Sequence, residues 1–396
     1  MDFSEFHSAE FQQFVQDHLQ DDPVQIRLKY HGKVNFDLQA AVQQIAARKS
    51  LKRKLPEWTA NPSIFFPGTI PLEQSSSELT AHFKAQKLSG KNMLDLTGGL
   101  GVDSYYLSKG FEKAVYCEQQ DELFEITRHN LEQLAPRKFD FHLGDGLEFL
   151  EKSEESFDLI YADPARRGKG NQKLYKLEDC EPNLVEAWKL LTSKASKILL
   201  KYSPMLDVTQ VWKTFPEIQK ITVVSVKNEV KELLLHWSKS DEIAAKKIEV
   251  YDLESGYPPF LFYQDEEEQA VSDFGEPENY LIEPISGILK AGAFKLFGER
   301  FSLKKLESNS HLYTSSNQPQ NIPGKVFEII EEVSPRKKDI QKIIPNGKAN
   351  VLTRNYSLGA EELRKKLGLK DGGEEYLIGT KTLKGYQVFR CKRIVE

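Results

Sequence analysis

The sequence predicts an α/β fold in which a mostly parallel sheet is built from strands that alternate with helices. Three observations support this prediction. A short apolar strand runs into a glycine turn at 92–103, four successive strands end in polar residues, and strand and helix patterns alternate from 92 to about 240. Parallel strands need a crossover between them, and a helix usually supplies it.

The glycine turn lies in the stretch Asn92–Asp103, where Leu94 and Leu96 belong to the strand. Glycines at positions 98, 99 and 101 let the backbone approach a ligand closely and adopt a positive φ. A helix that begins near Gly101 points its free N–H groups at whatever lies over the turn. The stretch therefore predicts a ligand site, although many nucleotide-binding folds use such a turn.

The next three strands end in acidic residues, at Glu118, Asp145 and Asp163. Glu118 comes about 20 residues after the glycines, where a Rossmann-type fold places the carboxylate that binds ribose hydroxyls. The last of these strands runs into Pro164-Ala-Arg166. The carboxyl ends of strands in an open parallel sheet form one crevice, so we expect these acids to share it.

This order of Asp-x-x-Gly-Gly-x-Gly, Glu, Gly-Asp and Asp-Pro resembles the class I S-adenosylmethionine-dependent methyltransferases. The resemblance implies a Rossmann-like seven-stranded sheet and S-adenosyl-L-methionine as cofactor. The short link between the strands at 221–226 and 233–237 predicts a hairpin, and the segments at 247–252 and 260–263 predict a further β-pair. Asp95 and the turn would shape the methionine side, Glu118 would bind the ribose and Asp145 the adenine amino group. An NAD-binding Rossmann domain is the rival interpretation, but it does not explain Asp-Pro-Ala-Arg. The cofactor-binding candidates are Gln74, Ser76, Asp95, Thr97, Gly98, Gly99, Gly101, Asp103, Glu118, Asp145, Gly146 and Asp163.

The candidate catalytic residues are Asp163, Pro164 and Arg166. Amine methyltransferases often carry Asn/Asp-Pro-Pro-aromatic here, and the side-chain oxygen and a backbone carbonyl accept hydrogen bonds from the target amine. This chain has alanine and arginine at the last two positions, so no aromatic ring from the motif stacks on a base. Arg166 and Arg167 could bind a phosphate or pair with an acid. The candidates that could stack on a base instead are Tyr161, Tyr175 and Tyr202. The polar loop at 168–173 is a candidate lid over the acceptor.

Asp-Pro-Ala-Arg-Gly also resembles a motif of RNA uracil-5-methyltransferases, which use a nucleophilic cysteine at the end of strand five. The corresponding stretch here is Lys201-Tyr-Ser-Pro-Met205, and Cys180 lies on a different segment. We therefore reject the covalent route.

Four regions are expected along the chain. Residues 1–72 form a helical region, 73–265 the methyltransferase domain, 272–315 a small α+β ferredoxin-like insert and 318–396 a C-terminal domain. The acidic run at 265–278 is typical of a solvated linker. The serines at 75–77 predict a helix N-cap, with Glu78 completing a capping box. Contact of Gln74 or Ser76 with the cofactor would be an added role.

The C-terminal domain resembles a THUMP-like domain through Asn350–Asn355, Leu363–Leu369 and Gly372-Gly373. The resemblance implies a module that positions RNA for the fused methyltransferase. Residues 317–396 hold 16 Lys and Arg against 10 Asp and Glu, a net charge of +6, whereas the whole chain carries −5. A separated basic domain suggests a phosphate-rich partner, and a solvated basic face is the alternative.

Composition narrows the function class further. The chain is 39% hydrophobic and 29% charged, and it has no apolar run near the ~20 residues that span a bilayer. Three scattered cysteines suggest a reducing, cytoplasmic location without disulfides or a metal site. The sequence leaves the oligomeric state open.

The sequence thus predicts a methyltransferase that acts on a nitrogen of an RNA base, with RNA bound through residues 318–396 and no membrane or metal partner. Two alternatives stay open. One is a methyltransferase for a protein or a small molecule, and the other is a non-catalytic RNA-binding protein that keeps the cofactor fold.

Overall fold

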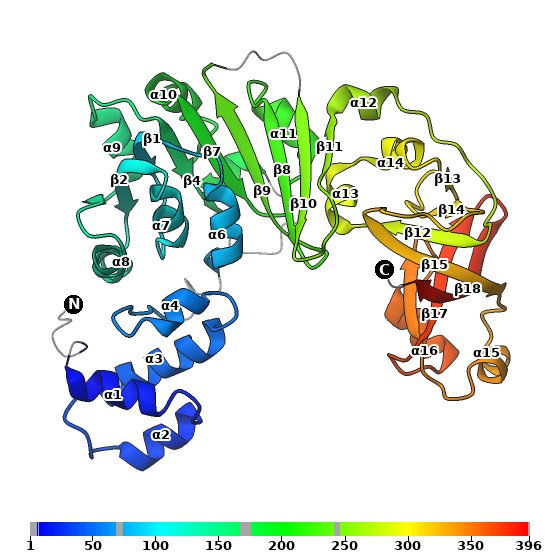
Figure 1. The fold of residues 1–396 in the computed structure, drawn as a ribbon, viewed down its shortest axis with the longest axis horizontal. Helices are drawn as coiled ribbons and strands as arrows, with labels where there is room; N and C mark the ends of the chain where they lie inside the picture. The colour runs from blue at the N-terminus through cyan, green and yellow to red at the C-terminus, as the bar shows by residue number, and fades with distance from the viewer. Residues whose placement is uncertain (1–5, 7, 69–73, 167–175, 241–245, 395–396) are drawn as a thin grey trace. The chain divides into compact units, whose positions relative to one another are not determined.

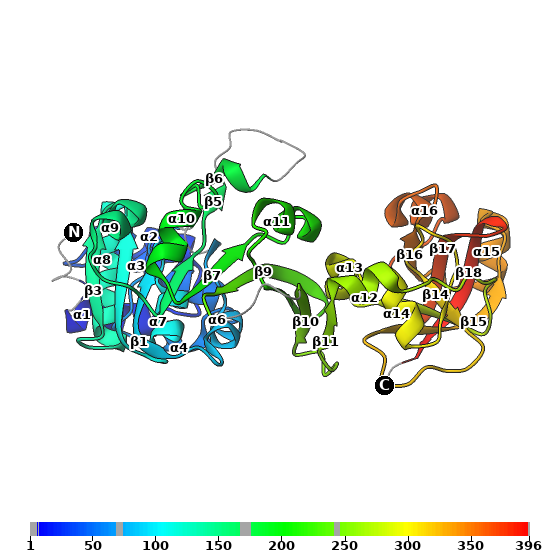
Figure 2. The same cartoon turned by 90° about the horizontal axis from the view of Figure 1, so that it is seen from above.

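The computed structural model describes residues 6, 8–68, 74–166, 176–240 and 246–394. The chain divides into two compact units. The first comprises Met1–Tyr202 with Leu235–Asp241, and the second comprises Ser203–Leu234 with Glu242–Glu396. Figure 1 and Figure 2 show the elements of both units in two views.

The first unit begins with four helices, as the sequence predicts. They are α1 (Ala9–Asp17), α2 (Pro23–Tyr30), α3 (Leu38–Leu51) and α4 (Pro56–Ala60). Ser8, Asp22 and Asp37 accept backbone hydrogen bonds as N-caps of the first three. An apolar cluster that includes Leu51, Trp58 and Phe66 packs against Val102 and Tyr106, so these helices share a core with the sheet-bearing part of the unit.

The capping box predicted at Ser75–Glu78 is wrong in one respect. Ser77 is the N-cap of α6 (Glu78–Ala85) and accepts from the backbone N–H of Thr80. Glu78 instead accepts from the backbone N–H groups of Glu57 and Trp58, at 3.1 and 3.0 Å. The first turn of α4 lacks a side-chain N-cap of its own, so Glu78 satisfies its free donors.

The large sheet contains nine strands, which are the seven predicted and the further β-pair at 247–252 and 260–263. Five of them pair in parallel, and their order within the sheet is β3 (Phe139–Leu143), β2 (Phe111–Glu118), β1 (Gly90–Asp95), β4 (Leu159–Ala162) and β7 (Lys197–Tyr202). After β7 come β9 (Glu229–Ser238), β8 (Lys220–Val226), β10 (Lys247–Leu253) and β11 (Phe260–Tyr263). The two additional strands are β10 and β11; β10 alternates buried and half-buried residues and pairs in parallel with β8.

Strands β8 and β9 form the predicted hairpin. Two residues, Lys227 and Asn228, join them, and both have positive φ, at 51° and 64°. This conformation is that of a two-residue turn whose twist matches antiparallel strands.

Helices separate the strands of the sheet: α7 (Val102–Ser108), α8 (Asp121–Leu134), α9 (Gly146–Lys152), α10 (Trp188–Lys194) and α11 (Val208–Thr214). Short β5 (Ala165–Arg166) and β6 (Cys180–Glu181) form a separate antiparallel pair, and the 3-10 turn η2 (Leu177–Asp179) precedes β6. The helix crossovers keep the chain direction the same in β1, β2, β3, β4 and β7, so the carboxyl ends of these strands lie at one edge of the sheet.

The second unit contains a seven-stranded sheet. Its order is β13 (Lys304–Lys305), β14 (Tyr313–Ser315), β12 (Tyr280–Pro284), β15 (Gly324–Glu332), β18 (Gly385–Ile394), β17 (Glu375–Thr382) and β16 (Asn350–Arg354). Helices α13 (Ser286–Ala291), α14 (Phe294–Arg300), α15 (Lys337–Ile343) and α16 (Ala360–Leu367) lie between strands of this region. The acidic run predicted as a linker begins with helix α12 (Gln264–Gln269), where Glu266 accepts from the backbone N–H of Tyr263 and Glu267 from that of Lys295.

Three further observations concern membrane-spanning helices, cysteines and metal sites. Within the described ranges, no helix is long and apolar enough to cross a membrane. Cys117, Cys180 and Cys391 are buried and form no disulfide with one another. No group of three or more His, Cys, Asp or Glu side chains suited to a metal ion occurs among the residues described.

Candidate functional site

The glycine turn and Glu118 lie together in the first unit, as the sequence predicts. The backbone N–H of Gly99 donates to Glu118 Oε2 at 2.9 Å, and the N–H of Gln120 donates to Oε1 at 2.9 Å. Gly99 and Gly101 have positive φ, at 57° and 75°. A Cβ on Gly98 would lie 2.1 Å from the ring of Tyr116, so the turn fits closely against β2. The loop after β1 is thus tied directly to the end of β2.

Asp145 and Gly146 lie at the start of α9, directly after β3. Asp145 is the N-cap and accepts from the backbone N–H groups of Leu147 and Glu148, and Gln119 donates to its other oxygen at 2.8 Å. A Cβ on Gly146 would lie 2.4 Å from the backbone oxygen of Leu96, so Gly146 allows α9 to begin against the end of β1. Asp145 therefore has a capping role in addition to its predicted contact with adenine.

Asp95 and Thr97 connect the end of β1 to the end of β4, its neighbour in the sheet. Asp95 is 1% exposed and accepts from the backbone N–H of Thr97 at 2.9 Å and from the hydroxyl of Ser104 at 2.5 Å. The backbone N–H of Asp163 donates to Thr97 Oγ1 at 2.7 Å. The turn after β1 and the Asp163 motif are therefore held by one chain of hydrogen bonds.

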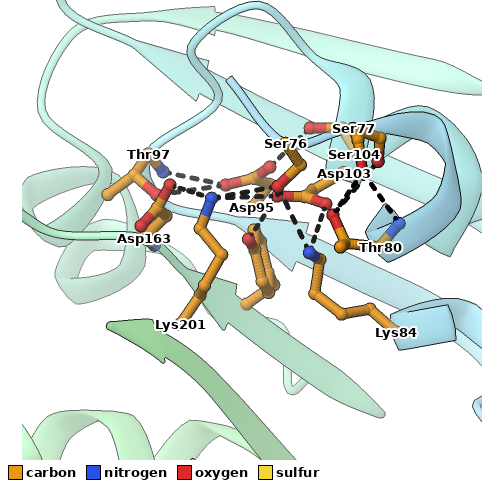
Figure 3. Close-up of polar contacts among 11 residues, drawn as sticks. Ser76, Ser77, Thr80, Lys84, Asp95, Thr97, Asp103, Ser104, Asp163 and Lys201 are labelled. Atoms are coloured by element: carbon orange, nitrogen blue, oxygen red, sulfur yellow. Dashed lines mark hydrogen bonds and ion pairs between the residues drawn. The ribbon is translucent and has the colours of Figure 1, made fainter. Parts of the chain in front are cut away.

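A buried charge cluster lies next to this chain and is drawn in Figure 3. We define it as Ser76, Lys84, Asp103, Asp163 and Lys201. Lys84 pairs with Asp103 Oδ1 at 3.1 Å, and Lys201 pairs with Asp103 Oδ2 at 3.4 Å and with Asp163 Oδ2 at 2.5 Å. Ser76 donates its hydroxyl to Asp103 at 2.6 Å and accepts from both lysines. The cluster joins α6, α7, the end of β4 and the end of β7.

Neither Lys84 nor Lys201 was singled out from the sequence. A signal was available for Lys201, because it interrupts the apolar run Ile198-Leu-Leu at the end of a buried strand. A charged residue at such a place is rarely buried unless it is paired. The sequence around Lys84 does not indicate a buried charge, since lysine is common in the last turn of a helix.

The cluster sets the protonation of its carboxyls. Burial alone would raise the pKa of Asp103, but the ammonium groups of Lys84 and Lys201, with hydrogen bonds from Ser76 and Tyr161, hold it well below its ordinary value. Asp163 has its pKa raised, because loss of water around the carboxyl outweighs the opposing effect of Lys201. Asp95 has no lysine partner of this kind, and burial raises its pKa to about 7.

Some predicted roles do not fit the structure. Tyr161 and Tyr202 are each 1% exposed, and Tyr161 donates its hydroxyl to Asp103 at 2.7 Å. Both rings are packed in the interior, so they cannot stack on an incoming base as the sequence suggested. Gln74 is exposed at the start of the segment that leads into α6.

Other predicted elements lie partly or wholly outside the described residues. The backbone of Arg166 pairs with Cys180 in the short β5–β6 hairpin, but its side chain is outside the description. Arg167, the candidate lid at 168–173 and Tyr175 also lie outside it. Pro164 is buried directly after Asp163.

Comparisons with known proteins agree with this architecture. Family models described as "Conserved hypothetical protein 95", "ferredoxin-like domain" and "THUMP domain-like" match residues 78–211, 280–323 and 324–393. A crystal structure of a protein from Porphyromonas gingivalis W83, provisionally assigned as a methyltransferase, is 32% identical. It matches with a TM-score of 0.87 over 100% of both chains.

Two curated relatives come from Mycobacterium tuberculosis, strains CDC 1551 and H37Rv. Both are described as uncharacterised S-adenosylmethionine-dependent methyltransferases. Each is 23% identical over 302 residues, which cover 76% of this chain and 80% of the relative. The chain belongs to the class I S-adenosylmethionine-dependent methyltransferases that carry a C-terminal THUMP-like domain.

Proposed function

We propose that this protein transfers a methyl group from S-adenosyl-L-methionine to RNA. The observation that carries the proposal is the convergence of two sets of residues in the first unit. The Gly99–Glu118 contact lies at the ends of β1 and β2, and the Asp163–Lys201 pair lies at the ends of β4 and β7. These four strands are consecutive in sheet order, so both sets open on one edge.

The residues at this edge fit the cofactor. A carboxylate offers about four lone-pair positions, and backbone N–H groups occupy two of those of Glu118, which leaves acceptor capacity for two ribose hydroxyls. Glycine at position 99 leaves the backbone open to a close approach. We assign the methionine side to Asp95, Thr97 and the turn, and the adenine side to Asp145 and Gly146.

The cofactor supplies an electrophilic methyl group on a positively charged sulfur. The protein's task is to hold an acceptor atom in line with that methyl group, at roughly 3 Å, and to take up a proton. Asp163 is suited to both tasks. Its backbone is fixed by Thr97, its carboxyl is held by Lys201, and its side chain is 37% exposed.

The second unit supports RNA as the substrate. The THUMP-like match covers 324–393, which lies within the basic 317–396 region. Three exposed lysines near α15 and α16 form what we call the basic face: Lys337, whose side chain passes directly over Gly368, and Lys348 and Lys370, which pair in a β-bridge. Clustered lysines of this kind neutralise phosphates without reading sequence.

The test is to incubate the full-length protein with radiolabelled S-adenosylmethionine and total RNA, protein or metabolite pools. We expect label in RNA. Label confined to protein or metabolites would overturn RNA as the substrate and would favour the second methyltransferase hypothesis. Binding of RNA without cofactor binding or transfer to any pool would favour the non-catalytic hypothesis.

The acceptor atom is a separate question. The Asp163-Pro164 motif predicts a base nitrogen, and that prediction rests on the sequence. Tyr161 and Tyr202 are buried, and this observation supports a proposal for a different acceptor, which is argued below.

A further inference from the structure

The ammonium group of Lys201 is surrounded by three acceptors. Its Nζ lies 2.5 Å from Asp163 Oδ2, 3.0 Å from Ser76 Oγ and 3.4 Å from Asp103 Oδ2. An ammonium group has three protons to donate, and these three acceptors, all among the described residues, match that number. Lys84 approaches the same Asp103 and Ser76 from the α6 side. Lys201 therefore places a positive charge directly against Asp163, whereas Lys84 pairs with Asp103 and Ser76, as Figure 3 shows.

The members of the cluster differ in their exposure to solvent. The side chain of Lys84 is 0% exposed, those of Lys201 and Asp103 are 9% and 10% exposed, and that of Asp163 is 37% exposed. An acceptor that arrives from solvent therefore meets the Asp163 carboxyl first. The two ammonium groups lie deeper, where a charge interacts more strongly than it does in water.

This arrangement favours an acceptor that becomes negative over one that becomes positive. An amine attacks through its neutral lone pair and carries a positive charge until it loses a proton. The ammonium group of Lys201, which pairs with Asp163 at 2.5 Å, would repel that positive charge. A hydroxyl develops negative charge on oxygen as its proton leaves, and nearby fixed cations stabilise that charge.

Within the described ranges, the two tyrosines expected to stack on a base are not available for it, and this points the same way. A flat base is usually held by aromatic faces. The rings of Tyr161 and Tyr202, which lie at the ends of β4 and β7, are buried. A ribose hydroxyl needs no such platform.

We propose that the acceptor is the 2′-hydroxyl of a ribose in RNA, with Asp163 as the proton acceptor and Lys201 as the residue that positions Asp163. This inference rests on the proposed function, which supplies RNA as the substrate. Within an RNA strand, the 2′-hydroxyl is the free ribose hydroxyl and the group that distinguishes RNA from DNA.

In the proposed step, the 2′-oxygen uses a lone pair to form a bond to the methyl carbon. The carbon–sulfur bond breaks, and its electron pair stays on sulfur, which becomes a neutral thioether. The hydroxyl proton passes to the Asp163 carboxylate and then to water. Lys201 transfers no proton in this step and holds the Asp163 carboxylate in place.

The first test identifies the product. Total RNA from cells that lack the protein is incubated with the full-length enzyme and labelled S-adenosylmethionine, and is digested to nucleosides for mass spectrometry. We expect 2′-O-methylated nucleosides, which also appear as dinucleotides resistant to alkali. Labelled nucleosides methylated only on the base would overturn this inference and leave the proposed function standing. Label in protein alone would overturn both.

The second test concerns Lys201, with Lys84→Met as the matched control. Both substitutions remove a buried ammonium group that contacts Asp103, and in the described part of the chain it is Lys201 that pairs with Asp163. We expect Lys201→Met to lower kcat by about 100-fold and Lys84→Met by much less. Calorimetry with S-adenosylhomocysteine should show less than about a threefold change in Kd for Lys201→Met. Equal kcat losses in the two variants would refute the positioning role.

A pH profile separates this role from a merely structural one. Lys201 and Lys84 lower the pKa of Asp163, whereas burial and Asp103 raise it. Removing Lys201 should therefore move the acidic limb of the kcat profile to higher pH, because more Asp163 is protonated at a given pH. An unmoved acidic limb would contradict the assignment of Asp163 as proton acceptor. Should Lys201→Met fail to fold, the product identified with the wild-type enzyme still decides the acceptor.

Discussion

Replacing Glu118 by alanine should weaken cofactor binding strongly. Glu118 is 9% exposed, and its two oxygens each accept one backbone hydrogen bond, at 2.9 Å. The two remaining acceptor positions would take the ribose hydroxyls. A hydrogen bond to a charged group contributes about 1.5–3 kcal/mol. Losing two such bonds costs at least about 3 kcal/mol, which corresponds to a roughly 100-fold higher Kd.

The assay is isothermal titration of the purified variant with S-adenosylhomocysteine. Glu118→Gln keeps the shape but presents N–H groups where a backbone N–H now donates, so we expect a loss of about tenfold. Glu122→Ala is the matched control, because Glu122 is an exposed acid in the first turn of α8. A Kd for Glu118→Ala within about threefold of the wild-type value would refute the assignment of the ribose side.

Three further outcomes are expected. Asp163→Ala should abolish methyl transfer yet leave the Kd for S-adenosylhomocysteine nearly unchanged, and a loss of affinity equal to that of Glu118→Ala would show that the two sides of the site are misassigned. Burial raises the pKa of Asp95 to about 7, from about 3.9 in the unfolded chain, so the free energy of unfolding should fall by up to about 1.4 kcal/mol per pH unit as pH rises between those values. Thermal unfolding of Asp95→Asn at several pH values should lack this slope. An equal dependence of stability on pH in the wild type and in Asp95→Asn would contradict the prediction. The double variant Lys337→Glu, Lys370→Glu should bind RNA more weakly in a filter-binding assay, and the slope of log Kd against log salt concentration should fall by roughly 1 per lysine. Lys213→Glu on α11 is the control and should change neither the affinity for RNA nor the slope. An unaltered slope in the double variant would exclude the basic face as the RNA contact.

The cofactor side of the site was predictable because local sequence encodes it. The glycines at 98–101 and the acids that end β2, β3 and β4 are adjacent in the chain to the strands that place them, so strand pattern and spacing were enough. The ligand roles of these residues stay predictions, since each acid also serves the fold: Asp145 caps α9, and Glu118 binds the turn.

The charge cluster was not predictable in the same way. Lys84, Asp103 and Lys201 lie on α6, α7 and β7, and tertiary folding brings them together across sequence separations of up to 117 residues. Nothing local distinguishes Lys84 from a solvated helix residue. The same limitation explains the tyrosines: Tyr161 and Tyr202 were proposed for stacking from their position in the chain, and packing of the strands turned both rings into the core.

The strand count illustrates a third limit. The segments at 247–252 and 260–263 read as β-structure, but which sheet they join depends on long-range pairing. Strand β10 aligns in parallel with β8 over Lys247–Leu253, and β11 then pairs with β10. Such register is set by the burial of alternate side chains against a neighbour that the sequence alone does not identify.

A crystal structure of the protein with S-adenosylhomocysteine tests the central claim most directly. The account predicts both ribose hydroxyls within hydrogen-bonding distance of Glu118, backbone of the turn at Gly99 against the ligand, and the sulfur facing the Asp163 carboxyl. A ligand bound away from the ends of β1, β2 and β4, or bound there with its sulfur turned away from Asp163, would contradict it.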